Sequence, residues 1–197
     1  MNILIDTLPK TVYLNEEEYD INYDFRISMI FEMLMQDNTL NDDEKLEQAL
    51  ELYYPIIPDN RSEAIEGIIW FYKCGKEDET EGKGTGKSAQ QIYNYNFDDE
   101  YIYSAFLDQY NIDLQDIEGL HWWKFKAMFR SLKEDNEIVK IMGYRAIDLN
   151  KIKDKEQKEY YRKLQKIHKI PVAKNEKEKL DEISNALMNG GDVSNLL

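Results

Sequence analysis

The feature that most constrains the fold is the spacing of apolar residues, which recur every three or four positions from about Tyr23 onward. Residues three and four apart lie on the same face of an α-helix, so this spacing predicts amphipathic helices. The first segment of this kind can be capped by Asp24 or Asn22. Its apolar face consists of Phe25, Met29, Ile30, Met33 and Leu34.

The same spacing, together with helix start and stop signals, predicts further helices along the chain. Leu120–Leu132 is the densest apolar segment and is expected to be a central, nearly encircled helix. We therefore predict a mainly α fold, with a helical domain over residues 1–170 and a C-terminal helical extension over 171–197, because Pro171 ends the long basic helix. The other predicted helices begin near Asn41, Pro58 and Phe97 and cover Glu137–Ile147, Lys151–Ile170 and a last segment from Asn175.

The N-terminal residues show a different pattern. Ile3-Leu4-Ile5 and Val12-Tyr13-Leu14 are short runs of β-prone residues, and Thr7–Lys10 between them is typical of a turn. These runs predict a small N-terminal β hairpin. Two strands alone are marginally stable, so the hairpin must pack on helices or on another chain.

One stretch, Lys76–Ser88, contains Gly, Lys, Glu, Asp and Thr but no large apolar residue, and it predicts a flexible internal loop over residues 76–96. Within it, Gly82–Ser88 reads GKGTGKS and is similar to a phosphate-binding loop. That motif requires four residues between its first glycine and the Gly-Lys pair, which places the first glycine at position 81, where this chain has Glu81. A buried strand should also precede the motif, yet an acidic run does. The sequence therefore does not predict a nucleotide site.

Charge is unevenly distributed over the chain, whose net charge is −14. Residues 1–120 hold 8 Lys and Arg against 27 Asp and Glu, whereas residues 121–197 hold 17 against 12. An acidic body with a basic rear segment favours self-association or a protein partner of mixed charge, although both parts can also be ordinary solvated surface. This charge distribution disfavours a nucleic-acid binder. No apolar run approaches the roughly 18 residues that cross a membrane. The absence of a signal peptide and the single Cys74 favour the cytoplasm.

No arrangement of residues predicts catalysis. The only histidines, His121 and His168, are far apart in sequence, and Cys74 is the only thiol, so no metal-ligand spacing is present. The carboxylates are abundant, but the sequence does not distinguish a catalytic pair among them. We expect a protein that is not an enzyme and that has no metal and no cofactor.

Several ordered motifs resemble a known family. They are Tyr19–Arg26, Trp70–Gly75, Phe97–Phe106, Ile112-Asp113-Leu114 followed by Leu120–Phe125, and Tyr144-Arg145. Together they resemble the tail assembly chaperones of siphophages and prophages of Gram-positive bacteria, which are encoded shortly before the tape measure protein. The resemblance covers about Ile3 to Ile170.

The resemblance implies a protein that binds the tape measure protein and keeps it soluble until tail-tube subunits displace it. Its partners would be the tape measure protein and other tail proteins, with self-association as a further option. It would act in the cytoplasm of the bacterial host and be absent from the mature virion. Two alternatives stay open: a structural tail or head–tail connector component, and a nucleic-acid-binding regulator that uses the aromatic and basic residues of 121–170.

Partner contacts are predicted at exposed or adaptable apolar residues. Within the helical domain we select Trp122, Trp123 and Phe125, with Met33 and Met35 as flexible apolar contacts. In the C-terminal extension, Leu180, Ile183 and Leu187 form an amphipathic stripe suited to self-association or to the client. The alternative for each residue is ordinary core packing.

Overall fold

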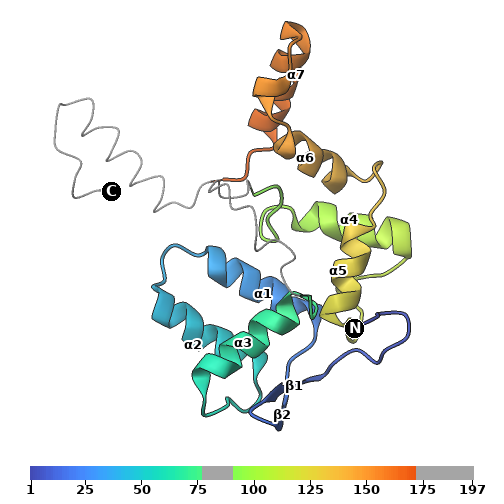
Figure 1. The fold of residues 1–197 in the computed structure, drawn as a ribbon. Coiled ribbons are helices and arrows are strands. Elements are labelled where there is room, and N and C mark those ends of the chain that lie inside the picture. The colour runs from blue at the N-terminus through green and yellow to red at the C-terminus, as the bar shows by residue number, and fades with distance from the viewer. Residues whose placement is uncertain (77–90, 172–197) are drawn as a thin grey trace, which may run out of the picture.

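The computed structural model describes residues 1–76 and 91–171, and within them the fold is mainly α with a small N-terminal β hairpin, as predicted (Figure 1). Two predictions lie outside the described residues. One concerns the Gly82–Ser88 motif, and the other the C-terminal helix with Leu180, Ile183 and Leu187. The division of the chain at residue 170 stays a prediction.

The hairpin consists of β1 (Thr11–Leu14) and β2 (Glu17–Asp20), paired antiparallel with Leu14 opposite Glu17. Asn15 and Glu16 connect the strands with φ of 48° and 68°, the left-handed conformation of a tight two-residue hairpin turn. The prediction that Ile3-Leu4-Ile5 is the other strand was wrong. Those residues form a turn in which Leu4 is 90% and Ile5 80% exposed, so they bury too little surface to hold a strand in place.

Three helices follow, and each start is fixed by a polar side chain. The carboxylate of Asp24 accepts the N–H of Arg26, and Asn41 and Glu44 form a reciprocal capping box. At the far end of the third helix Gly75, at φ 63°, donates its N–H to the carbonyl of Trp70, as in a glycine-terminated helix. The helices are α1 (Phe25–Gln36), α2 (Asp42–Tyr53) and α3 (Arg61–Tyr72). They pack in sequence order, and α3 also packs on β1.

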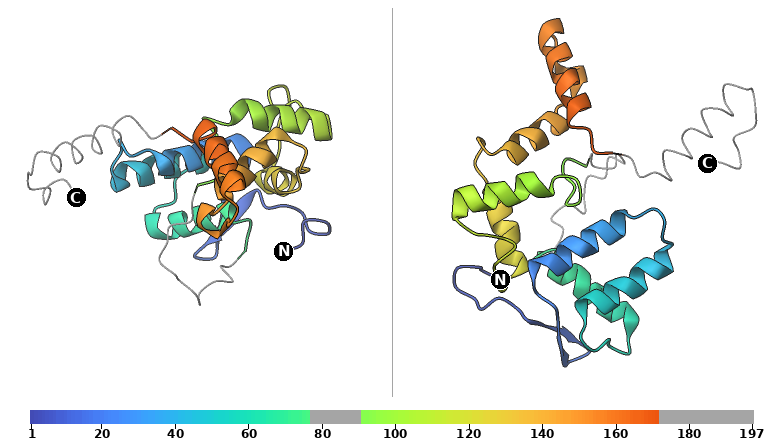
Figure 2. Two further views of the ribbon diagram at one scale, coloured as in Figure 1. Left: turned by 90° about the horizontal axis from the view of Figure 1, so that it is seen from above. Right: turned by 180° about the vertical axis from the view of Figure 1, so that it is seen from behind.

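The last helices of the described chain lie at the end of the molecule opposite the hairpin (Figures 1 and 2). The predicted helix over Lys151–Ile170 was wrong at its start, because Asp154 caps a new helix there by accepting the N–H of Gln157. The segment before it forms a short 3-10 turn, η1 (Leu149–Lys151). The helices are α4 (Asp99–Tyr110), α5 (Trp122–Arg130), α6 (Glu137–Ala146) and α7 (Lys155–Ile167).

The core is built around α5, which is the central helix that the sequence predicts. The ring of Phe125 is fully buried and lies 5.0 Å from that of Phe25 in α1 and 4.8 Å from that of Phe106 in α4, centroid to centroid. Stacked aromatic pairs at these distances add to the gain from burying their surface. Phe125 therefore joins the α1–α3 part of the molecule to the α4–α6 part.

Residues 91–96 differ from the predicted flexible loop over 76–96. Tyr95 is only 8% exposed, and its ring lies 6.3 Å from that of Phe125. The ring of Tyr93 packs edge-on against Phe129, 5.3 Å away. Tyr93 and Tyr95 therefore pack on the core, and the predicted flexible loop was wrong for them, whereas Gln91 and Asn96 are exposed.

Candidate functional site

The predicted aromatic contacts of α5 lie inside the protein. Trp122 and Phe125 are fully buried and Trp123 is 4% exposed. The indole N–H of Trp122 donates to the carbonyl of Tyr72 at 2.9 Å, and that of Trp123 donates to the carbonyl of Phe71 at 2.8 Å. Both carbonyls belong to the last turn of α3, where helix carbonyls lack partners within the helix. In this conformation the two indoles fix α3 on α5, and all three side chains are inaccessible to a partner. Their role in partner contact stays a prediction.

His121 begins α5, and both of its ring nitrogens are used. Nδ1 accepts the backbone N–H of Trp123 at 3.1 Å, so the proton of the neutral ring lies on Nε2, which donates to the carbonyl of Pro9 at 2.8 Å. The residue is 8% exposed. Burial is the main cause that lowers the pKa of His121 below its ordinary value of 6.5, and Lys124 and Lys10 lower it further against the opposing bond to Pro9.

We expect acidification to destabilise the protein through His121. Because the pKa of His121 is lower in the folded protein, the unfolded chain binds more protons at pH values between that lowered pKa and 6.5. The contribution of His121 to stability is therefore fully present above pH 6.5 and is lost as the pH falls below 6.5. The free energy of unfolding should fall by on the order of 1 kcal/mol between pH of about 7.5 and about 5.5. Urea denaturation at the two pH values measures this. His121→Asn keeps an acceptor for the Trp123 N–H and should flatten the dependence; an equally steep dependence in that variant would contradict the assignment.

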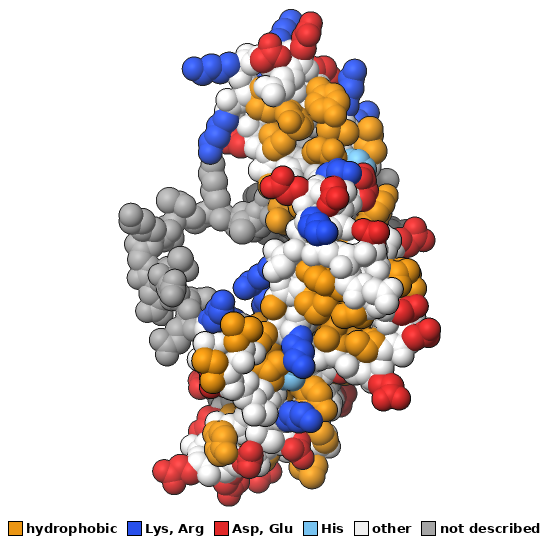
Figure 3. All heavy atoms as spheres, turned by 90° about the vertical axis from the view of Figure 1, so that its right-hand side faces the viewer, with side chains coloured by type: hydrophobic (Ala, Val, Ile, Leu, Met, Phe, Trp, Pro, Cys, Tyr) orange, Lys and Arg blue, Asp and Glu red, His pale blue; other side chains and the backbone are white. Residues whose placement is uncertain are grey.

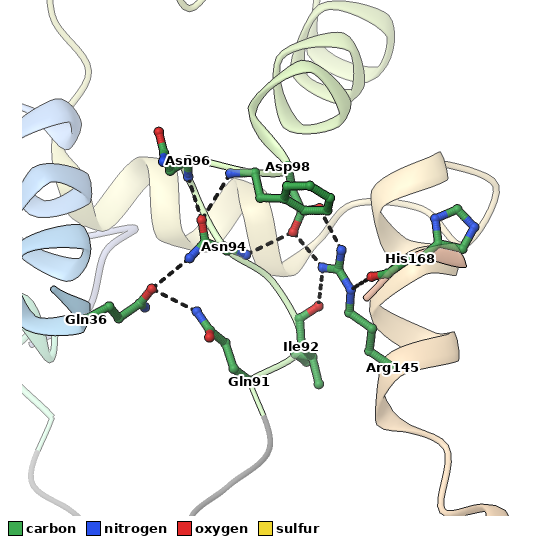
Figure 4. Close-up of polar contacts among 9 residues, drawn as sticks. Gln36, Gln91, Ile92, Asn94, Asn96, Asp98, Arg145 and His168 are labelled. Carbon is green, nitrogen blue, oxygen red and sulfur yellow. Dashed lines mark hydrogen bonds and ion pairs between the residues drawn. The ribbon is translucent and has the colours of Figure 1, made fainter. Parts of the chain in front are cut away.

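A buried ion pair joins α4 to α6. The guanidinium of Arg145 donates to both carboxylate oxygens of Asp98, at 2.6 and 2.9 Å, and the two side chains are 4% and 0% exposed (Figure 4). Two further N–H groups of Arg145 donate to the carbonyl of Ile92 at 3.0 Å and to the carbonyl of His168 at 2.6 Å. Asp98 also accepts the N–H of Asn94 at 2.9 Å. We call these five residues the Arg145 node.

The Arg145 node extends to α1 through amide side chains. Gln36 accepts from the side-chain amides of Asn94 and Gln91, at 2.9 and 2.8 Å (Figure 4). His168 directly follows α7, so one guanidinium holds the start of α4, the segment 91–94 and the end of α7. From the sequence, Arg145 was identified only as part of a family motif. Its partner Asp98 is 47 positions away, and a pair so far apart leaves no local sequence pattern.

The last described helix has an apolar face that the rest of the described chain leaves largely uncovered. No residue of α7 is buried, and Tyr160 and Ile167 are 57% and 70% exposed. With the half-buried Leu164, they lie at helical spacing on one face, which we call the α7 stripe. The side chain of Gln165 attaches another face of the helix to the end of α6 by donating to the carbonyls of Tyr144 and Ile147.

Charged side chains of both signs border the α7 stripe, since Glu156 and Lys163 lie four and three positions from Tyr160 along the helix. The helix carries five Lys and Arg, Lys155, Lys158, Arg162, Lys163 and Lys166, against Glu156 and Glu159. Figure 3 shows hydrophobic side chains gathered at this end of the molecule with charged residues at their margin. This arrangement, an apolar strip with a charged rim, is typical of a surface that binds another helix.

The two predicted methionine contacts lie in α1, in different settings. Met33 lines a surface pocket of about 430 Å³ between α1 and α2, together with Ile30, which is 41% exposed, and with Leu40 and Leu52. Met35 is half-buried against the core, and its carbonyl accepts from the side chain of Lys45. Of the pair, only Met33 lines this pocket.

Residues 1–76 and 91–171 contain no group of three or more His, Cys, Asp and Glu side chains that could hold a metal ion. None of the helices in these two ranges is both long and apolar enough to span a bilayer.

The comparison with protein families covers most of the chain. The family described as Bacteriophage Gp15 protein matches residues 4–170, from the N-terminal turn to the segment that follows α7. No curated protein and no solved structure matches the chain. The matched region contains the hairpin, all the helices described above and the Arg145 node. The chain belongs to the Bacteriophage Gp15 protein family.

Proposed function

We propose that this phage protein is a tail assembly chaperone that binds the tape measure protein and keeps it soluble during tail-tube assembly, without catalysing a reaction. Three findings support the proposal: the ordered motifs that resemble such chaperones, the membership of a bacteriophage family, and the uncovered α7 stripe. The stripe is the observation that carries it, because a chaperone needs an accessible apolar surface on a protein that is itself soluble.

The geometry of α7 suits a helical client. A long client with apolar faces aggregates when those faces are exposed to water. α7 packs mainly on α6, so a client helix can lie along the opposite side and bury Tyr160, Leu164 and Ile167. The helix carries more Lys and Arg than Glu, and this net positive charge favours a client segment with acidic residues beside its apolar ones. The contact is small, which agrees with a partner that tube subunits later displace.

The test is co-expression with the gene product encoded next downstream. We expect the wild-type chain to solubilise and co-purify with that protein, and Tyr160→Ser with Ile167→Ser to reduce the recovered client by about tenfold, the loss that follows from removing two exposed apolar contacts. The matched control is Tyr101→Ser with Leu107→Ser on α4, where the side chains are 39% and 41% exposed. This control should leave recovery unchanged.

Two outcomes would contradict the proposal. If the wild-type chain neither solubilises nor co-purifies with the downstream product, the chaperone role is wrong. If the protein is recovered in stoichiometric amounts from purified virions, it is a structural tail component, because a chaperone that acts in the host cytoplasm should be depleted from the particle. Quantitative mass spectrometry of purified particles measures the second.

A further inference from the structure

A groove runs along β1 at the end of the molecule opposite α7. It has a volume of about 730 Å³ and lies between the hairpin, α3 and the N-terminal residues. One wall is made by five consecutive residues, Thr11 to Asn15, so side chains of both faces of the strand line it, as expected for a groove that follows a strand edge. The opposite wall is formed by residues 63, 66, 67 and 70 of α3. We call this feature the β1 groove.

The edge of β1 along this groove has free backbone groups. β1 pairs only with β2 in the part of the chain that the structure describes. In an antiparallel pair, every second residue of a strand forms backbone hydrogen bonds with the partner strand. The N–H of Ile21 donates to the carbonyl of Lys10, so in this register Lys10 and every second residue after it face β2. Val12 and Leu14 bond to β2, so the N–H and C=O groups of Thr11 and Tyr13 point away from it. An exposed row of this kind is a template for another strand.

The walls of the β1 groove offer apolar contact on both sides of that edge. Tyr13 is 72% exposed and Trp70 is 42% exposed, whereas Val12 and Leu14 are buried against α3. α3 approaches this closely because of Gly67. A Cβ at that position would lie 2.7 Å from the hydroxyl of Tyr54 and 3.2 Å from a methyl group of Leu14. The partly exposed rings of Tyr13 and Trp70 can both contact a bulky apolar side chain of a bound partner.

The charged side chains that line the β1 groove are all acidic. Glu18, Glu63 and Glu66 line it, and none of its lining residues is Lys, Arg or His. Asn60 donates to one oxygen of Glu63, but the other, Oε2, is buried without a hydrogen-bond partner in the described structure. A buried carboxylate oxygen without a partner is costly, and a cationic group from outside would relieve that cost. A second copy of this hairpin does not fit, because it would add Glu16, Glu17 and Glu18 to an acidic groove.

We propose that the β1 groove binds an extended segment of another polypeptide, which pairs with the free edge of β1 and places a Lys or Arg side chain beside Glu63 and Glu66. Side chains alternate along a strand, so the apolar residues on either side of that cation pack toward Trp70 and Tyr13. Main-chain bonds supply affinity in this mode of recognition and the side chains supply selectivity. The β1 groove is distinct from the α7 stripe, and its partner is extended and basic rather than helical.

The first experiment measures binding of a fluorescein-labelled hexapeptide of alternating Lys and Val by fluorescence anisotropy. We expect saturable binding that weakens as salt is added, and at least about tenfold weaker binding of the matched peptide with Glu in place of Lys. A third peptide, with N-methyl groups on the amides of one edge, cannot donate along that edge and should also bind weakly. Absence of saturable binding, or equal binding of the Lys and Glu peptides, would overturn the proposal.

The second experiment changes the protein. Tyr13→Pro removes the outward N–H of β1 but no bond to β2, because proline is tolerated where a strand N–H faces away from the sheet. Tyr13→Ala removes the same side chain and keeps the N–H, so we expect the proline variant to bind the Lys peptide about tenfold more weakly than the alanine variant. Glu63→Gln with Glu66→Gln should weaken binding by a similar factor. Far-UV circular dichroism confirms that each variant is folded, and equal affinity of the proline and alanine variants would exclude strand pairing.

Discussion

Replacing Asp98 with alanine should lower the free energy of unfolding by about 3–5 kcal/mol, because it leaves the charge of Arg145 buried without its carboxylate partner. Both side chains are almost completely excluded from water, and the carboxylate accepts two guanidinium bonds and the N–H of Asn94. The loss is a large fraction of the roughly 5–15 kcal/mol that stabilises a typical domain. Urea denaturation followed by far-UV circular dichroism measures it.

The matched control is the ion pair between Arg61 and Glu47, whose side chains are 60% and 44% exposed. Arg61→Ala should cost less than about 1 kcal/mol, because water already solvates both charges. Replacing Asp98 and Arg145 together with alanine and methionine should recover part of the loss, because no unpaired charge is then buried. Similar losses in Asp98→Ala and Arg61→Ala would show that the Arg145 node contributes little to stability.

Phe125→Ala should lower the free energy of unfolding by about 3–5 kcal/mol, the usual cost of deleting a buried aromatic ring. Phe125 is fully buried and stacks on Phe25, Phe106 and Trp122, with centroids 5.0, 4.8 and 5.8 Å away. Its removal leaves a cavity at the point where α1, α4 and α5 meet. The same denaturation experiment measures the loss.

Tyr160→Ala is the control for an exposed aromatic residue and should change stability by less than about 0.5 kcal/mol. The pair of variants also separates the two roles considered for Phe125. Truncation of a core residue lowers the stability of the protein. Truncation of a residue that serves only partner contact weakens binding and leaves the stability unchanged. A Phe125→Ala protein as stable as the wild type would therefore refute the core assignment and support the partner contact.

The helices were predictable because their determinants are local. The apolar spacing of Phe25 to Leu34, the cap at Asn41 and the left-handed stop at Gly75 lie within a few residues of the structure that they specify. The prediction of α5 as the central helix also rests on local sequence, since its apolar residues are the densest in the chain. The expectation that it is nearly encircled was wrong, because Lys124, Ala127 and Arg130 form an exposed face.

The features of the fold that could not be predicted from the sequence depend on distant residues or on unusual local conformations. The turn at Asn15 and Glu16 adopts positive φ without glycine, and the acidic β2 lacks the β-branched residues that mark a strand. The run Val12-Tyr13-Leu14 was therefore correctly predicted as a strand, but its partner was sought on the wrong side of it. The spacing of Trp122, Trp123 and Phe125 favoured the core, but sequence alone left partner contact open as a role for them. Only the fold shows that their rings pack in the core and that the indole N–H groups bond to the end of α3.

The clustering of the aromatic residues has an optical consequence. The chain has 3 tryptophans, Trp70, Trp122 and Trp123, and they all lie where α3 meets α5. The rings of Trp70 and Trp123 are 5.6 Å apart, and that of Trp122 stacks on Tyr72 at 5.5 Å. Tryptophan fluorescence is therefore a local probe of one junction and does not report directly on α6 and α7. Emission and ellipticity follow different parts of this molecule, and coincident transitions in the two signals would mean that both ends unfold as one cooperative unit.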